Sequence, residues 1–249
     1  MTASLAHIFR HPIKAHGREE LASVRLLAGA CLPWDRHWAV THGKSKFDPA
    51  APGWLPPGNF QRAARTRTLM AMTARLDEAT GRVALAHPDL DPLEIDPETE
   101  GPRLIDWLAP ISPEGDFAPL SLVRGPRGMT DSDFPSISIK NLASNAALSR
   151  HMGVDLSIHR WRGNLWLDGM EPWAEVGLIG REIRIGQARL KVVDRIGRCK
   201  ATTGNPETGI EDADTLAALR AVVGVQDFGV YAEVIVAGEI ACGDRMEIV

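Results

Sequence analysis

Glycine and proline are spread along the whole chain and divide it into short segments. The 249 residues include 23 Gly and 17 Pro, and neither residue is concentrated in one linker. Both residues interrupt regular structure, so few stretches are long enough for a long helix. Short apolar stretches that alternate with polar residues and end at turn residues are typical of β-strands. This spacing predicts a mainly β protein with many brief strands and few helices.

Composition and charge narrow the class of protein. Apolar residues make up 44% and charged residues 24% of the chain, which is typical of a globular protein and excludes wholesale disorder. The formal net charge of −4 argues against a nucleic-acid binder, because such domains are usually basic. No apolar run approaches the roughly 20 residues that span a bilayer. The N-terminus lacks the pattern of a signal peptide, so we expect a cytoplasmic protein without a membrane partner.

Alternating segments predict strands along most of the chain. Turn residues bound these segments, as at 77–81, where Asp-Glu-Ala-Thr-Gly predicts a hairpin. Residues 61–74 fit a helix or, in their second half, a strand, and the acidic stretch 89–100 predicts a solvated face or loop. Strands are expected at 5–13, 21–27, 38–41, 82–87, 120–124, 155–161, 164–168, 182–185, 188–194, 230–236 and 244–249.

Two stretches have the features of helices. Residues 139–152 place apolar residues near helical spacing, with Asn141 or Ser144 as the N-cap and Gly153 as the closing residue. Residues 213–223 follow acidic residues that complement the positive end of a helix dipole.

A proline-containing stretch at 110–119 predicts a connector between two parts of the chain. The parts are residues 1–115 and residues 116–249. A closed or partly closed barrel in each part would bury the strands without leaving long open edges. The predicted fold class is therefore mainly β with a few helices (α+β), with a β-barrel core and a smaller N-terminal β-barrel-like domain.

Cys199 is the cysteine with the most suggestive surroundings. Residues 181–200 hold seven basic and two acidic residues, and Arg198 and Lys200 flank the sulfur directly. Nearby cations stabilise a thiolate, although on a strand both neighbours would face away from Cys199. An isolated cysteine on a strand is also commonly packed and inert, so both interpretations stay open. Cys31 and Cys242 lack such surroundings and are expected to be structural.

A row of polar side chains predicts an anion site. Arg160, Arg162 and Asn164 occupy every second position, so on a strand they would project from one face. Two guanidinium groups and an amide in a row can hold a phosphate, whereas the alternative is a solvated face of an edge strand. Lys14 and Arg36 add two cations beside tight turns. No dinucleotide-binding, Walker, zinc-protease or nucleophile-elbow motif is present, and the eight His are scattered singly.

Seven elements, taken in order along the chain, resemble the MOSC family, named for the C-terminal domain of molybdenum-cofactor sulfurase, together with its N-terminal β-barrel partner domain. The resemblance covers nearly the whole chain. Residues 198–209, Arg-Cys-Lys-Ala-Thr-Thr-Gly-Asn-Pro-Glu-Thr-Gly, are close to the family's Arg-Cys-x-x-Thr-Thr-Val-Asp-Pro-Glu-Thr-Gly. The other elements are 11–14 (HPIK), 35–38 (DRHW), 160–164 (RWRGN), 169–175 (GMEPWAE), 228–231 (FGVY) and 238–244 (GEIACGD).

The resemblance implies a molybdenum-cofactor site. It implies that the thiolate of Cys199 is the metal ligand and catalytic residue. A soft thiolate suits molybdenum, and a single protein ligand leaves other positions on the metal open. The implied cofactor-binding residues are Lys14, Arg36, Arg162, Asn164, Arg198 and Cys199. Amidoxime-reducing relatives imply a reductase of N-hydroxylated or N-oxygenated small molecules. The chain lacks the cysteines of the iron–sulfur domain that some relatives append, so a ferredoxin- or flavin-type partner would deliver the electrons. The pyridoxal-phosphate domain of the sulfurases is also absent, so we expect neither an iron–sulfur cluster nor pyridoxal phosphate in this chain.

The chain departs from the family pattern at four positions. Ala15 stands where the family usually has Ser, Gly163 replaces Pro, and Gly204-Asn205 replaces Val-Asp. These departures leave an alternative open, in which the chain is a non-redox module that carries the cofactor, or carries sulfur as a Cys199 persulfide. A structural domain that has lost the ligand is a third hypothesis.

Overall fold

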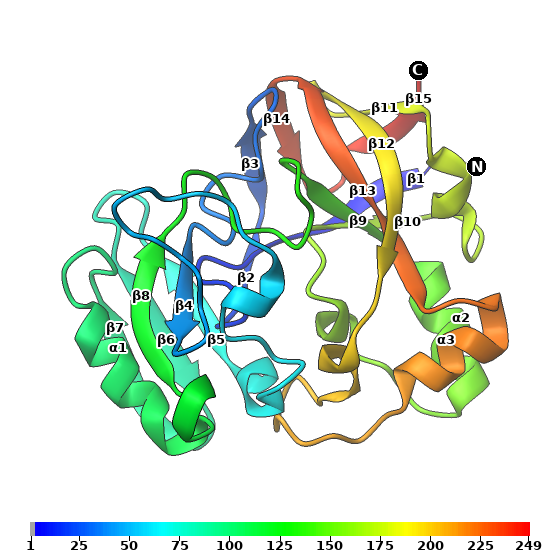
Figure 1. Ribbon diagram of the computed structural model, residues 1–249. Coiled ribbons are helices and arrows are strands. Elements are labelled where there is room, and N and C mark those ends of the chain that lie inside the picture. The colour runs from blue at the N-terminus through cyan, green and yellow to red at the C-terminus, as the bar shows by residue number, and fades with distance from the viewer. Residues whose placement is uncertain (1–2) are drawn as a thin grey trace.

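The central feature of the computed structural model, which describes residues 3–249, is a closed barrel of seven strands (Figure 1). The strand order is β10-β9-β13-β12-β11-β15-β1, and β1 pairs with β10 to close the ring. The strands are β1 (Ala3–Arg10), β9 (Ile137–Asn141), β10 (Leu165–Asp168), β11 (Glu182–Ile185), β12 (Ala188–Gly197), β13 (Asp227–Val236) and β15 (Arg245–Ile248). A short strand, β2 (Glu19–Leu21), extends the sheet beside β1. Closure leaves no open edge in the ring, and the predicted barrel core is confirmed.

Alternating side chains fill the barrel. On β11, Ile183 and Ile185 are fully buried while Arg184 between them is exposed. The long strand β12 continues this pattern with the buried residues Leu190 and Val192. Successive side chains of a strand point to opposite faces, so this alternation places one apolar face of each strand inside the ring.

The N-terminal part of the chain forms smaller sheets beside the barrel. One pairs β4 (Trp38–His42) with β8 (Pro119–Arg124), and another contains β5 (Thr73–Leu76), β6 (Val83–His87) and β7 (Leu90–Ile95). A third pairs β3 (Ser23–Leu26) with β14 (Gly238–Ala241). The helix α1 (Gly101–Leu108) packs against β7 and β8, at the left of Figure 1. A second apolar core lies between these elements and includes the fully buried residues Leu104 and Leu108.

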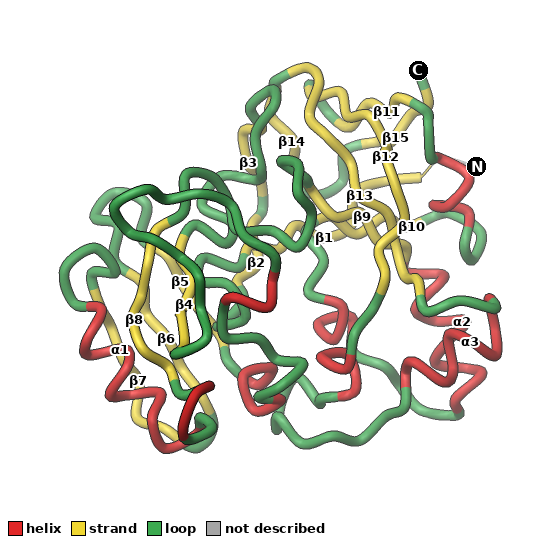
Figure 2. The backbone as a smooth tube through the Cα atoms, in the orientation of Figure 1, coloured by secondary structure: helices red, strands yellow, loops and turns green. Residues whose placement is uncertain are grey.

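Two further helices pack together below the barrel, as the red segments of Figure 2 show: α2 (Leu142–Met152) and α3 (Thr215–Val223). The Asn141 side chain accepts the N–H of Ala143, and Gly153 ends α2 with a φ of 67°, so both predicted caps are confirmed. No helix within residues 3–249 has both the length and the apolar character needed to cross a membrane. Short 3-10 helices complete the chain: η1 (Pro57–Asn59), η2 (Arg67–Ala71), η3 (Ala109–Ile111), η4 (Gly115–Phe117), η5 (Ile158–Trp161), η6 (Ala174–Leu178) and η7 (Lys200–Thr203).

Several local predictions were wrong. The helix expected from residue 139 begins at Leu142, because residues 137–141 belong to the barrel strand β9. The strand expected at 155–161 is a loop and the 3-10 helix η5, since the Ser157 side chain accepts the N–H of His159 and turns the chain. The stretch 61–74 holds η2 and the first residues of β5 in place of a helix. The acidic stretch contains β7, whose residues are mostly exposed or half-buried, which agrees with the predicted solvated face.

The first strand of the chain belongs to the same barrel as the last strands. Residues Ser4–Ile8 of β1 pair with β10, and Ala3 and Ser4 pair with β15. Strands β1 and β15, which are far apart in the sequence, are thus hydrogen-bonded within the same barrel. The division into residues 1–115 and 116–249 stays a prediction.

Candidate functional site

A cavity of about 410 Å³ lies between the barrel and the N-terminal part. Strand ends of the barrel line one side, and the loops near residues 14, 36 and 62 line the other. The six residues that the sequence analysis assigned to a cofactor all line this cavity: Lys14, Arg36, Arg162, Asn164, Arg198 and Cys199. The structure thus brings together side chains that are up to 185 positions apart in the sequence, although their roles in binding stay predictions.

Cys199 lies directly after β12 and is exposed at the cavity. It is the N-cap residue of η7, and Thr202 closes the turn by donating its hydroxyl to the Cys199 carbonyl at 3.1 Å. The strand therefore ends before the cysteine, and the flanking cations are not constrained to the opposite face. A thiol in this position can reach a ligand in the cavity.

Arg160 holds the loop that follows Cys199. Its Nη1 donates to the carbonyl of Gly204 at 3.0 Å, and its Nη2 pairs with Asp212 at 2.6 Å. The Arg160 side chain is buried, whereas Asp212 is exposed, so the ion pair lies at the edge of the protein interior. The prediction that Arg160 projects beside Arg162 and Asn164 from one strand face was wrong, because the chain turns at η5. Arg160 acts as a positioning residue for the cysteine loop.

Arg162 carries a positive charge that the described protein groups compensate poorly. The residue adopts a left-handed conformation with a φ of 45°, which directs the chain from η5 into β10. Its Nη2 donates to the Gly17 carbonyl at 3.1 Å, whereas its buried Nη1 has no hydrogen-bond partner within residues 3–249. Burial and the charges of Arg36 and Arg18 lower the pKa of Arg162 to about 9. An anion in the cavity would relieve this repulsion.

Arg36 approaches Arg162 from a loop of the N-terminal part. Its Nη1 pairs with the buried carboxylate of Asp35, and its Nη2 donates to the Arg162 carbonyl at 3.0 Å. Burial opposes ionisation of Asp35, but the charge of Arg36 and the hydrogen bond from His11 hold its pKa well below the usual range. Asp35 therefore serves to hold Arg36 in place.

Lys14 and Asp131 form a further charged pair of the cavity. The Lys14 Nζ donates to the Met129 carbonyl at 2.7 Å and to the Asp131 carboxylate at 2.5 Å. The Lys14 side chain is buried, whereas that of Asp131 is open. Partial loss of hydration within the cavity opposes ionisation of Asp131, but Lys14 and Arg36 lower the pKa of this carboxyl group to about 2. The Asp131 carboxylate, which faces the cavity, therefore already binds the Lys14 ammonium group. An anion that binds Lys14 more tightly could displace it.

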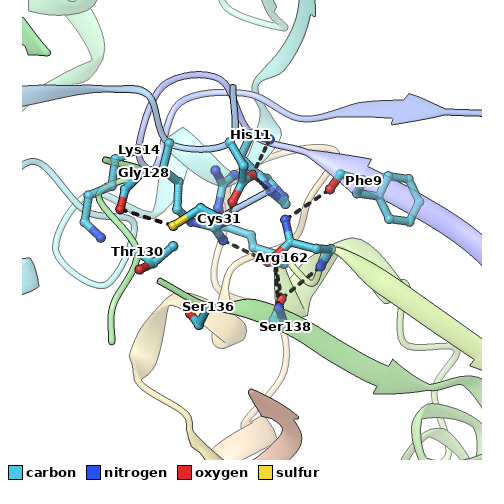
Figure 3. A network of polar contacts seen from close by, with 12 residues as sticks. Phe9, His11, Lys14, Cys31, Gly128, Thr130, Ser136, Ser138 and Arg162 are labelled. Atoms are coloured by element: carbon cyan, nitrogen blue, oxygen red, sulfur yellow. Dashed lines mark hydrogen bonds and ion pairs between the residues drawn. The ribbon is translucent and has the colours of Figure 1, made fainter. Parts of the chain in front are cut away.

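Asn164 is tied to two barrel strands. Its Oδ1 accepts from the Ser138 hydroxyl at 2.8 Å and from the Ser138 N–H at 3.1 Å, and its Nδ2 donates to the Phe9 carbonyl at 3.2 Å (Figure 3). The Phe9 N–H also donates to the Asn164 carbonyl at 2.7 Å. These bonds join β1, β9 and the turn before β10, so the Asn164 amide stabilises the barrel strands at the side of the cavity.

Arg198 reaches beneath the cysteine loop toward η5. Its Nη2 donates to the Trp161 carbonyl at 2.8 Å, and its guanidinium carbon lies 5.8 Å from the Trp161 ring centre. Its buried Nε has no hydrogen-bond partner within the described residues, and burial lowers the pKa of this guanidinium. Arg198 therefore adds a second poorly compensated cation to the cavity.

Two of the departures from the family pattern, Gly163 and Asn205, have local explanations. Ala15 lines the cavity in a left-handed conformation. A Cβ atom on Gly163 would lie 2.5 Å from the Cγ of Lys140, a buried lysine whose Nζ donates to the Phe228 carbonyl. Asn205 accepts the N–H of Glu207 and donates to Asp212, the partner of Arg160. Gly163 thus makes room for Lys140, and Asn205 supports the loop that carries Cys199.

The sequence analysis missed several charged or polar residues of the cavity, among them Arg62, Asp131 and Tyr231. Tyr231 is the single tyrosine of the chain and lies in the Phe-Gly-Val-Tyr element, which was the available signal. Burial and the charge of Asp131 raise its pKa to about 12, so the phenol stays protonated at neutral pH. Arg62 and Asp131 stand in no element that marked them, and only the tertiary structure brings them to the site.

Acidification is expected to destabilise the protein through His16, which lies behind the cavity. His16 is buried, its Nδ1 lies 2.7 Å from the Lys14 carbonyl, and burial lowers its pKa to about 4. The unfolded chain, with a pKa near 6.5, then binds more protons between about pH 4 and 6.5, so stability falls as pH falls through this range. We expect His16 to cost about 2 kcal/mol between pH 7 and 5.

Urea unfolding at pH 7 and pH 5 measures this contribution. The variant His16→Gln should lose part of the pH dependence, whereas replacement of the exposed His151 by Gln should keep it. An unchanged difference in unfolding free energy between the two pH values in His16→Gln would show that this histidine is not buried in its neutral form.

Comparison with known proteins shows which family part of the chain resembles. Residues 129–247 match the model of the MOSC domain. The solved structure of the YuaD protein from Bacillus subtilis is 14% identical with a TM-score of 0.48, and the match covers 100% of this chain and 96% of that one. YiiM from Geobacillus stearothermophilus is 18% identical with a TM-score of 0.36, and YiiM from Escherichia coli is 20% identical with a TM-score of 0.34. Each YiiM match covers 45% of this chain and 53% of the other. Among curated proteins no match was found.

The matched residues include the barrel strands from β9 to β13 and the cysteine loop. Arg162, Asn164, Arg198 and Cys199 lie inside this range, whereas Lys14 and Arg36 reach the cavity from outside it. The family assignment by resemblance is thereby confirmed. Residues 129–247 are a MOSC domain, of a domain family associated with the molybdenum cofactor.

Proposed function

We propose that the cavity binds the molybdenum cofactor and that the protein reduces N-hydroxylated small molecules. The observation that carries this proposal is the meeting of one exposed thiol with guanidinium groups that have no carboxylate partner within residues 3–249. The thiol belongs to Cys199, and the guanidinium groups to Arg162 and Arg198. A cofactor with an anionic phosphate and a thiolate-binding metal matches both features.

The residues of the cavity fit such a group. The phosphate would be held by Lys14, Arg36 and Arg162, because their charges converge and the buried Nη1 of Arg162 has no partner within the described chain. Cys199 would ligate the metal. When bound, the molybdenum centre supplies two-electron redox chemistry. Arg198 would balance the negative charge of the thiolate beside it.

The proposed reaction cleaves an N–O bond. An amidoxime takes up two electrons and two protons, the N–O bond breaks, and an amidine and one water molecule leave. We propose a separate ferredoxin- or flavin-type protein as the source of the electrons, while the protons come from solvent. Tyr231 carries a proton on its Oη at neutral pH and lines the cavity, so it is the residue placed to pass a proton to the leaving oxygen. The carboxyl groups of Asp35 and Glu175 do not line the cavity and contact Arg36 and Ser144 instead, so neither is proposed as the proton donor.

Turnover of benzamidoxime tests this proposal. Protein from a molybdenum-replete host, supplied with a flavin–iron–sulfur electron donor, is expected to form benzamidine. The same protein from a host that makes no molybdenum cofactor is the control and should be inactive. If fully loaded protein forms no benzamidine, the reductase proposal fails and the carrier hypothesis takes its place.

A further inference from the structure

The charges that line the cavity are strongly unbalanced. Six cationic residues and one carboxylate, Asp131, contribute to the lining. Three of the cations have a carboxylate partner: Lys14 pairs with Asp131, Arg36 with Asp35 and Arg160 with Asp212. The other three, Arg62, Arg162 and Arg198, form no ion pair within residues 3–249. The cavity can therefore accept more negative charge than one phosphate group brings.

The three unpaired cations differ in their exposure. The Arg162 and Arg198 side chains each hold a buried nitrogen without a partner, and both lie beside the residues proposed for the cofactor. Arg62 is exposed, as is Cys199. A molecule that enters from solvent and approaches the sulfur thus shares the open part of the cavity with Arg62.

The backbone around Arg62 is held firmly. The preceding residue, Gln61, donates its N–H to the Val40 carbonyl at 2.7 Å and its Nε2 to the Phe117 carbonyl at 2.5 Å. The following residue, Ala63, is buried in the N-terminal core, and the Arg62 carbonyl accepts the N–H of Arg65 at 3.0 Å. The backbone at Arg62 therefore loses little further freedom when a ligand binds, and the ordering cost is confined to the side chain.

The same segment packs against the cysteine loop. Arg67, in η2, donates its Nε to the Thr203 hydroxyl of η7 at 3.1 Å and pairs with Glu211 at 2.8 Å. Ala201 packs against the apolar cluster that contains Ala63. These contacts fix the segment of Arg62 relative to the loop of Cys199.

We infer that the substrate is itself an anion, an N-hydroxylated compound with a carboxylate group, and that Arg62 binds this carboxylate; the inference rests on the proposed reductase function. A guanidinium group presents paired N–H donors that match the two oxygens of a carboxylate. Arg62 is then a specificity-determining residue, which selects substrates without taking part in the cleavage of the N–O bond.

Steady-state kinetics of loaded protein with benzamidoxime and 4-carboxybenzamidoxime test the inference. The natural protein is expected to use the carboxylated compound at least about tenfold more efficiently in kcat/KM. In Arg62→Gln this preference should vanish through a higher KM, with kcat retained, and in Arg62→Glu it should reverse. Arg65→Gln is the matched control, since Arg65 lies over the Phe117 ring and does not line the cavity.

Two measurements without turnover complete the test. Calorimetric binding of 4-carboxybenzamide, which has no N–O bond, should weaken about tenfold in Arg62→Gln and stay unchanged in Arg65→Gln. Molybdenum content should be equal in all variants. Loss of molybdenum in Arg62→Gln would place Arg62 in the cofactor site, and equal use of both amidoximes by the natural protein would mean that the substrate need not be an anion; either result overturns the inference. If no amidoxime is reduced, the proposed function fails, while the calorimetry still decides whether Arg62 binds carboxylates.

Discussion

Replacing Cys199 with alanine is expected to lower the molybdenum content of the purified protein by at least about tenfold, because this change removes the thiol that we propose as the metal ligand. Within the described chain Cys199 is the cysteine that lines the cavity. The surrounding cations remain and can still attract an anion, but they are not ligands for the metal. Elemental analysis of protein from a molybdenum-replete host measures the effect. Benzamidoxime reduction should fall in parallel.

Cys242→Ala is the matched control for this experiment. Cys242 is also an exposed free cysteine, but its Sγ lies near the Leu21 carbonyl and away from the cavity lining. The Cys242→Ala variant should keep its full molybdenum content. If Cys199→Ala retains molybdenum as well, the sulfur is not the ligand. A natural protein that contains no molybdenum, but in which Cys199 carries extra sulfur by mass spectrometry, would favour the persulfide carrier.

Asn164→Ala is expected to destabilise the protein by about 3 kcal/mol, a large loss for one side chain. The substitution leaves the Ser138 N–H and hydroxyl and the Phe9 carbonyl without their partner at a buried position. Unpaired buried polar groups lose their hydration without compensation, so the cost exceeds that of a single exposed hydrogen bond. The free energy of unfolding in urea is the quantity to compare.

Asn59→Ala gives the scale for that comparison. The Asn59 side chain also bonds to backbone groups, accepting from Lys46 and donating to Pro56, but these bonds are open to solvent. Its loss should cost less than about 1 kcal/mol, because water replaces the missing partner. Equal effects of the two substitutions would refute the view that Asn164 joins the strands of the barrel.

Local sequence signals predicted strands well where a buried face alternates with an exposed one. The strands β6 and β11 occupy nearly the predicted residues, and the caps of α2 were identified because Asn and Gly have specific backbone roles there. The prediction was wrong at η5, where polar and apolar residues also alternate. There a serine hydroxyl and the ion pair between Arg160 and Asp212 stabilise a turn, and spacing cannot show such partners.

The sequence by itself determined the mainly β fold class, the MOSC resemblance and the six residues expected to share a site, because these depend on local patterns and on motifs in a fixed order. Only the tertiary structure decided that β1 closes the barrel, that Arg160 and Asn164 bond to the protein, and that Arg62 faces the same cavity as Cys199. Each of these features depends on contacts between residues far apart in the chain. Hydrogen-bond partners and uncompensated charges are set by distance in space, which the order of residues does not contain.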